Sequence, residues 1–134
     1  MKSIVLDSFA LLAFLRNEQG AEVVNSYFAD ALTGKVSLWM SSVNWAEVGN
    51  IVIRKRGLPG WRNAQTLLAD LPFGLVETTP ELTDQASQFK AAHKMSLADA
   101  YAAALAKIKK AELVTGDPEF KPLEQTLKGI VWLN

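Results

Sequence analysis

The sequence predicts an α/β fold with a central, mostly parallel sheet of about five strands and helices on both faces. Short apolar runs alternate along the chain with longer segments whose apolar residues recur at helical spacing, a pattern typical of strand–helix–strand units. The first run, residues 4–6, is apolar at every position, as expected for a strand buried on both faces. An acid, Asp7, ends this run, and a helical segment follows at once.

The first half of the chain contains two strands, each followed by helical segments. Residues 9–15 place apolar side chains at every turn, which predicts a helix packed closely on the sheet. Residues 21–32 carry a second helical stripe, and Gly34 interrupts it. The run 36–40 then reads as the second strand, ended by two serines.

Two helices are expected before the third strand. The first begins near Asn44 and ends in the basic cluster Arg54-Lys55-Arg56, before Gly57. Cations at a helix carboxyl end complement the helix dipole, which gives this cluster a purely structural explanation. The second helix is expected over 61–71, where Pro72 stops it.

The second half of the chain repeats the alternation. A helix opened by Thr79-Pro80-Glu81 runs through about residue 93, and a strong alanine-rich helix covers 96–109. The expected strands are 74–78, 112–115 and 129–133.

Length and composition favour one soluble domain covering residues 1–134. Fourteen basic and fourteen acidic residues cancel, so a polyanionic partner would have to be held by local patches. The chain has no cysteine, which excludes disulfides and thiolate metal sites and suits a reducing cytosol. Asp7 interrupts any signal-peptide core, and no segment approaches the ~20 apolar residues of a membrane helix. We therefore expect a cytoplasmic protein without a membrane partner.

Four acids occur at one kind of place, beyond a strand or in the first turns of a helix. Because the carboxyl ends of parallel strands meet at one edge of a sheet, these acids are expected to converge there. Asp7 and Asp117 would face each other if the first and fourth strands are neighbours. The four acids are Asp7, Glu47, Asp99 and Asp117.

Each acid also has a structural explanation as a helix cap. Asp7 is a preferred N-cap residue, and Asp117-Pro118 fits an N-cap followed by proline. The pairs Asn44 with Glu47 and Ser96 with Asp99 fit a capping box. Taken singly, each acid is more readily explained as a cap than as a catalyst.

Taken together, the acids predict a metal site. Two carboxylates ~4 Å apart repel by roughly 4 kcal/mol at an effective dielectric of 20, and no Lys or Arg lies beside Asp7 or Asp99 in sequence. The cluster therefore needs a proton or a divalent cation. Oxygen ligands without His or Cys favour Mg²⁺ or Mn²⁺ over zinc. Ala103 and Ala106 share the helical face of Asp99, which leaves space before the acid or permits close helix packing.

Four segments form an ordered set over essentially the whole chain, although no single segment is specific. The segments are Leu6-Asp7-Ser8, Asn44-x-x-Glu47, Ser96-Leu97-Ala98-Asp99-Ala100 and Thr115-Gly116-Asp117-Pro118-Glu119-Phe120. This ordered set resembles the signature segments of the PIN domain, most closely those of the small toxins of VapBC-type toxin–antitoxin pairs.

The resemblance implies a single PIN-like domain over residues 1–134 and a Mg²⁺- or Mn²⁺-dependent ribonuclease that is silenced by an antitoxin. It also implies a homodimer. Carried over by residue, Asp7, Glu47, Asp99 and Asp117 would form the metal site, with support from the Thr115 hydroxyl. Ser8 and Asn44 would contribute less directly.

The RNA phosphates would be met by local cations, each of which is equally well explained as part of a solvated face. His93 has no evident nucleophile partner, so we interpret it as a packed or surface residue. Trp45 and Trp61 can stack on bases or on a partner, but core packing is their default. The candidate phosphate contacts are Arg54, Lys55, Arg56, Lys90 and Lys94.

Two non-catalytic alternatives remain open at this point. A receiver-like phosphate or metal receptor needs an acidic pair after the first strand and a lysine near the end of the last strand; the chain offers Asp7-Ser8 and no lysine after Lys128. A PIN-like fold retained only for protein binding is disfavoured by the presence of all four acids. For the antitoxin, the apolar and aromatic helices around residues 45–71 are the expected contact surface.

Overall fold

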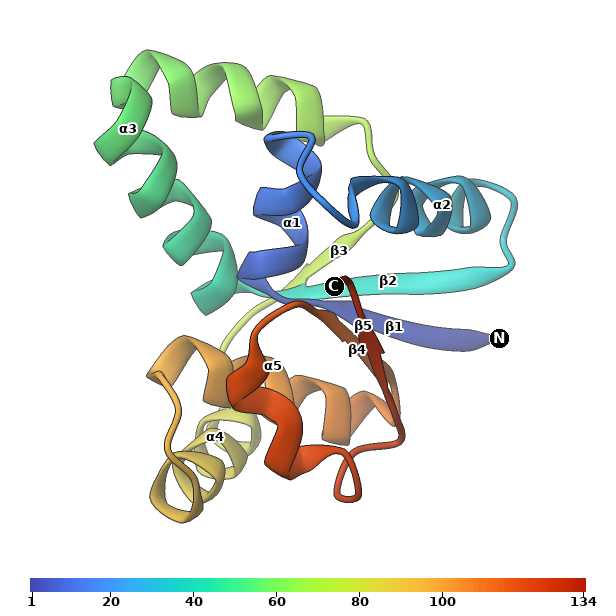
Figure 1. Ribbon diagram of the computed structural model, residues 1–134, viewed down its shortest axis with the longest axis vertical. Helices are drawn as coiled ribbons and strands as arrows, with labels where there is room; N and C mark the ends of the chain where they lie inside the picture. The colour runs from blue at the N-terminus through green and yellow to red at the C-terminus, as the bar shows by residue number, and fades with distance from the viewer.

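A five-stranded, all-parallel sheet forms the centre of the computed structural model, which describes residues 1–134. The strand order is β3-β2-β1-β4-β5 (Figure 1). The predicted mostly parallel sheet is thus confirmed, although β3 is shorter than expected. The strands are β1 (Lys2–Leu6), β2 (Val36–Ser41), β3 (Gly74–Val76), β4 (Glu112–Thr115) and β5 (Ile130–Trp132).

Helices cover both faces of this sheet, as predicted (Figure 1). One face carries α1 (Ser8–Leu15), α2 (Ala21–Leu32) and α3 (Ser42–Ala69). The other carries α4 (Pro80–Ala92), α5 (Leu97–Lys109) and the 3₁₀ helix η1 (Pro118–Leu123). None of these helices combines the length and the apolar character that crossing a bilayer requires.

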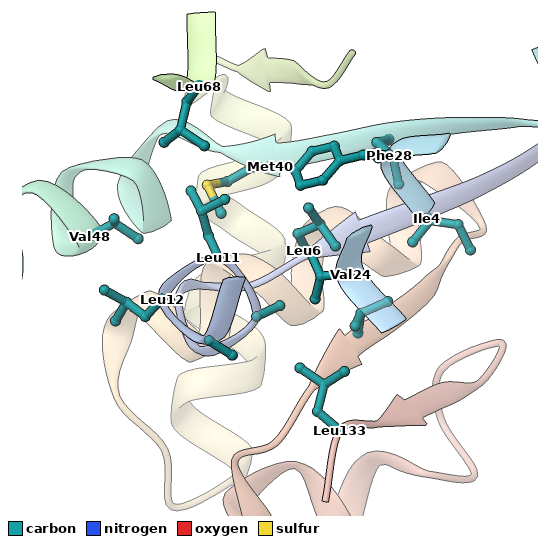
Figure 2. Packing of buried hydrophobic residues seen from close by; sticks show 14 of the residues in the cluster. Ile4, Leu6, Leu11, Leu12, Val24, Phe28, Met40, Val48, Leu68 and Leu133 are labelled. Atoms are coloured by element: carbon teal, nitrogen blue, oxygen red, sulfur yellow. The ribbon is translucent and has the colours of Figure 1, made fainter. Parts of the chain in front are cut away.

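Strand β1 anchors the fold because it contributes to both hydrophobic cores. Its last three residues, Ile4, Val5 and Leu6, are fully buried. Ile4 and Leu6 point into the core under α1 and α2, together with Leu11, Phe28 and Met40 (Figure 2). Val5 points to the opposite face and packs in the core under α4 and α5. Because side chains alternate along a strand, β1 packs between both helical layers. Asp7 follows the last residue of β1 and therefore lies at the carboxyl edge of the sheet.

The small side chains of α5 serve close packing. Ala103 and Ala106 are buried in the core that α5 shares with α4 and the sheet. The alanine face therefore serves close packing of α5 on its neighbours and does not leave open space before Asp99.

Helix α3 consists of two arms that meet at Gly57, where φ is 71°. The two predicted helices are therefore confirmed, and the positive φ explains why glycine stands at the kink. The arms fold back on each other because the Trp61 ring packs against Trp45, with ring centroids 4.9 Å apart. Gly49 allows this approach, since a Cβ there would lie 2.9 Å from the Trp61 ring.

The start of α3 corrects one prediction. The N-cap is Ser41, whose Oγ accepts hydrogen bonds from the backbone N–H groups of Val43 and Asn44. The expected capping box between Asn44 and Glu47 is therefore wrong. Since α3 begins at Ser42, Asn44 and Glu47 lie inside the helix and do not cap it.

Candidate metal centre

An acidic pocket of about 270 Å³ lies at the carboxyl edge of the sheet. It forms there because β1 and β4 are parallel neighbours, with Leu6 opposite Val114, so the residues that follow both strands meet. Helices α1, α3 and α5 begin at the same edge and contribute the remaining walls. The lining residues are Ser8, Phe9, Leu12, Glu47, Ile51, Ser96, Asp99, Asp117 and Glu119.

Asp7 lies behind this pocket and is both a cap and a member of the acidic cluster. Its side chain is 1% exposed. Oδ1 accepts a hydrogen bond of 2.8 Å from the backbone N–H of Ala10, which caps α1. Oδ2 accepts one of 2.5 Å from the Thr115 hydroxyl, and Thr115 Oγ1 in turn accepts one of 3.0 Å from the backbone N–H of Asp117. Thr115 therefore links the ends of β1 and β4 through their acids.

The acids affect one another's protonation. Burial raises the pKa of Asp7 to about 7, and the charges of Asp117 and Glu47 add to this effect, while the hydrogen bonds from Thr115 and Ala10 oppose it. Burial also raises the pKa of Asp99 to about 8, helped by a hydrogen bond with Asp117 and by the charges of Asp117, Asp7 and Glu47. The four predicted acids therefore lie within electrostatic range of one another.

Asp99, Asp117 and Glu119 form one group of carboxylates in the pocket, in which Asp99 is buried, Asp117 half-buried and Glu119 exposed. One carboxylate oxygen from each of the three lies within 4.8 Å of the others. Ser96 Oγ caps α5 by accepting from the backbone N–H of Asp99, which is the serine half of the predicted capping box. This bond does not use the Asp99 carboxylate. Asp117 also caps η1 by accepting from the backbone N–H of Glu119.

Glu119 was not recognised from the sequence. The only available signal was its place two residues after Asp117, in a segment that the PIN resemblance includes. Its approach to Asp99 depends on the tight 3₁₀ turn that begins at Pro118, and a sequence pattern does not specify that turn.

Asn44 ties together the three helix starts around the pocket. It is fully buried, and its Nδ2 donates to Ser8 Oγ at 3.0 Å and to the Ala98 carbonyl at 3.2 Å. Because Ser8 Oγ itself donates to the Asn44 carbonyl, both Nδ2 partners act as acceptors, which fixes the orientation of the amide. The Oδ1 atom of the same amide is buried and has no hydrogen-bond partner within the chain.

The predicted phosphate-binding cations lie away from the acidic pocket, which no Lys or Arg lines. Lys55 and Arg56, with Arg16, border a separate groove of about 210 Å³ between α1 and the two arms of α3. Lys90 is exposed on α4, and Lys94 is exposed just beyond it. His93 ends α4 and packs against Phe89, with ring centroids 6.3 Å apart.

The donor set fits a hard divalent cation. All candidate ligands are carboxylates, without His or Cys, and such sets favour Mg²⁺ or Mn²⁺. Protonation and cation binding are the two ways to relieve crowded carboxylates. Since burial and mutual repulsion act on Asp7 and Asp99 without a basic neighbour, a bound cation would compensate the cluster at neutral pH.

Comparisons with known proteins agree with this architecture. A family model described as the PIN domain matches residues 4–124. No curated protein sequence matches the chain. Several solved structures match its fold over nearly the whole length.

Three of these structures illustrate the likeness. VapBC2 from Rickettsia felis, bound to a DNA fragment from its promoter, superposes with a TM-score of 0.76 at 14% identity, covering 98% of this chain and 99% of that chain. A toxin–antitoxin complex from Klebsiella pneumoniae gives 0.70 at 17% identity, covering 98% of each chain. VapC20 from Mycobacterium tuberculosis, a toxin that cleaves the sarcin–ricin loop, gives 0.69 at 16% identity, covering 89% and 93%. At these identities the likeness establishes the fold.

Proposed function

The chain belongs to the PIN-domain family, and from that premise we propose that it is a Mg²⁺- or Mn²⁺-dependent endoribonuclease that acts as the toxin of a toxin–antitoxin pair. The observation that carries the proposal is that Glu47, Asp99 and Asp117 line one pocket at the edge of the sheet, while Thr115 joins the Asp7 carboxylate to the backbone of Asp117. These acids come from four distant parts of the chain. Capping alone explains none of their mutual proximity.

We assign the metal to Asp99 and Asp117 at the front of the cluster and to Asp7 behind them. Glu47, on α3, would contribute directly or through water, and Glu119 adds a carboxylate that the sequence pattern had not suggested. The hydroxyl of Thr115 holds Asp7 in place. Asn44 and Ser8 support the site indirectly, because their hydrogen bonds join α1, α3 and the start of α5.

In this proposal the reaction is hydrolysis of an RNA phosphodiester bond. When bound, the divalent cation would supply an acidified water and compensation of negative charge on the phosphate. Asp7 and Asp99 would help to hold this cation, and both carboxylates would stay ionised while it is bound. Glu47, half-buried on the opposite wall, would orient the attacking water. The chain has no cysteine, and its only histidine, His93, does not line the acidic pocket, so neither residue type supports covalent catalysis there.

The test is cleavage of a labelled RNA by the purified chain, with and without metal. We expect cleavage in Mg²⁺ or Mn²⁺, loss of cleavage in EDTA, and recovery when the metal is returned in excess. Cleavage at an unchanged rate in EDTA would contradict the metal-dependent mechanism. Correctly folded protein that binds Mn²⁺ but leaves RNA intact would instead favour a non-catalytic PIN-like binding module.

We propose that the antitoxin occupies the groove between α1 and α3. Its lining combines the apolar side chains of Leu12, Val52 and Leu67 with the basic side chains of Arg16, Lys55 and Arg56. This combination would suit an amphipathic segment with acidic side chains. Leu12 also lines the acidic pocket, so a bound segment would lie beside the catalytic residues. The solved relatives include toxin–antitoxin complexes, which supports an antitoxin as the partner. The homodimer is proposed from the family resemblance.

The partner proposal predicts that a small neighbouring reading frame encodes a protein that copurifies with this chain and restores growth when the two are coexpressed. We expect Lys55→Glu combined with Arg56→Glu to weaken that complex by about tenfold or more, because the substitutions reverse the charge of the groove's lining. RNA cleavage by the free variant should persist, because Lys55 and Arg56 line the groove and not the acidic pocket; a loss of cleavage would instead support their alternative role as RNA-phosphate contacts. Unchanged affinity in the double variant would exclude this groove as the contact.

A further inference from the structure

The acidic pocket has an apolar side that its carboxylates do not explain. Phe9, Leu12 and Ile51 line the same 270 Å³ space as the acids. Phe9 is 41% exposed, and it is the only aromatic residue among the large hydrophobic side chains that are exposed. A pocket that served only to hold a cation would not need an exposed aromatic ring at its rim.

The ring of Phe9 is held in place by the chain segment that carries Asp117. A Cβ at position 116 would lie 2.2 Å from Phe9 Cε1 and 2.5 Å from Cζ. Gly116 therefore provides the space into which one edge of the ring packs. Phe9 follows Asp7 by two residues, and Gly116 immediately precedes Asp117. The ring is thus fixed between two acids of the site.

The pocket offers few other ways to hold RNA. No Lys or Arg lines it, and its carboxylates repel phosphate except where a cation compensates them. Stacking of a base on an aromatic ring needs neither charge nor a particular base. The ring provides an uncharged contact beside the place where the phosphate would react.

We infer that Phe9 stacks on the nucleobase next to the scissile phosphate and so positions single-stranded RNA over the acidic cluster. This inference rests on the proposed ribonuclease function. It makes unpaired nucleotides, rather than duplex RNA, the substrate of the pocket, because a base must leave its own stack to reach the ring.

The experiment uses short single-stranded RNAs that carry 2-aminopurine at one position at a time, with Ca²⁺ in place of Mg²⁺ and the integrity of the RNA checked afterwards. Because the stacked base must leave its neighbours, the wild-type chain should change the emission at one position more than at the others. Phe9→Leu keeps an apolar side chain without a ring, and it should lose that position-specific change and bind the RNA up to about tenfold more weakly. Phe9→Trp keeps an aromatic face and should retain both.

Leu58→Ala is the matched control, because Leu58 is exposed but does not line the acidic pocket; it should behave as wild type. An equal emission change and equal affinity in Phe9→Leu and wild type would overturn the stacking contact while leaving the ribonuclease proposal intact. Normal RNA binding by Phe9→Leu together with weaker antitoxin binding would assign the ring to the protein partner and also overturn it. Absence of both RNA binding and cleavage in wild type would overturn the ribonuclease proposal itself. Should Phe9→Leu unfold, Phe9→Met, which also keeps an apolar side chain without a ring, replaces it with the same expected and contrary results.

Discussion

Replacing Asp7 with asparagine is expected to abolish metal-dependent RNA cleavage while the protein stays folded. Asparagine caps a helix about as well as aspartate, and its side-chain oxygen can still accept the hydrogen bond from Ala10. The amide cannot, however, supply the negative charge that a divalent cation needs from this position. Substituting a residue that only hydrogen-bonds to a metal ligand already lowers metal affinity or activity by about 10- to 100-fold. For a metal ligand itself we therefore expect the initial rate of cleavage to fall by about 100-fold or more.

The matched control is Asp84→Asn, which makes the same chemical change on the exposed face of α4, where Asp84 accepts a hydrogen bond only from Gln88. This variant should cleave RNA at the wild-type rate. Circular dichroism and thermal unfolding would establish that both variants are folded. Full activity in Asp7→Asn would show that Asp7 serves only as the N-cap of α1.

The metal-free protein is expected to become less stable as the pH rises from about 4 to about 8. In the unfolded chain Asp7 titrates near 3.8, whereas burial raises its pKa to about 7 in the folded protein. The folded state therefore binds this proton more tightly, and the resulting stability is complete below the unfolded pKa and lost as the pH rises through the folded one. The loss from Asp7 amounts to about 4 kcal/mol of unfolding free energy. Asp99 acts in the same direction.

Urea unfolding in EDTA at several pH values would measure this dependence. Asp7→Asn should show a smaller decrease and should exceed the wild type in stability near pH 8, because the amide is buried without a charge. Mn²⁺ should stabilise the wild type most at the alkaline end of the range. A wild-type stability that rises with pH between 5 and 8 would contradict the crowding of the acids.

The fold could be predicted largely because local patterns and burial agree in this chain. The wholly apolar run at the end of β1 fits a strand that contributes to both cores, and Ile4, Val5 and Leu6 do so. Helical spacing located the helices on either side, and Gly57 marked the break within α3. The true start of α3 was missed because Ser41, at the end of a strand, caps a helix that begins two residues before Asn44.

The site could be predicted as a set of acids but not as an arrangement. Parallel strand order brings Asp7 and Asp117 together, and that follows from topology. The proximity of Glu119 to Asp99 depends on the path of the chain after Pro118, which only the folded structure specifies. The hydrogen bonds of Asn44 to Ser8 and Ala98 likewise join residues up to 54 positions apart, beyond the reach of local sequence patterns.

The same limit applies to surfaces. The basic cluster at 54–56 was explained equally well by RNA contact and by the helix dipole. In the folded chain Lys55 and Arg56 lie along the groove between α1 and α3 instead of in the acidic pocket. Phe9 was expected only as part of an apolar helix; in the folded chain it lines the acidic pocket, is 41% exposed and packs against Gly116.

The central claim is that Asp7, Asp99 and Asp117 are ionised together around a divalent cation. The most direct test is the anomalous scattering of Mn²⁺ in crystals grown at pH 8 in a few millimolar MnCl₂. The account predicts an anomalous peak within coordination distance of Asp99 and Asp117, on the side facing Asp7, that is absent from crystals of Asp99→Asn. Crystals in which this edge of the sheet stays free of Mn²⁺, while the ion occupies other acidic surfaces, would contradict it.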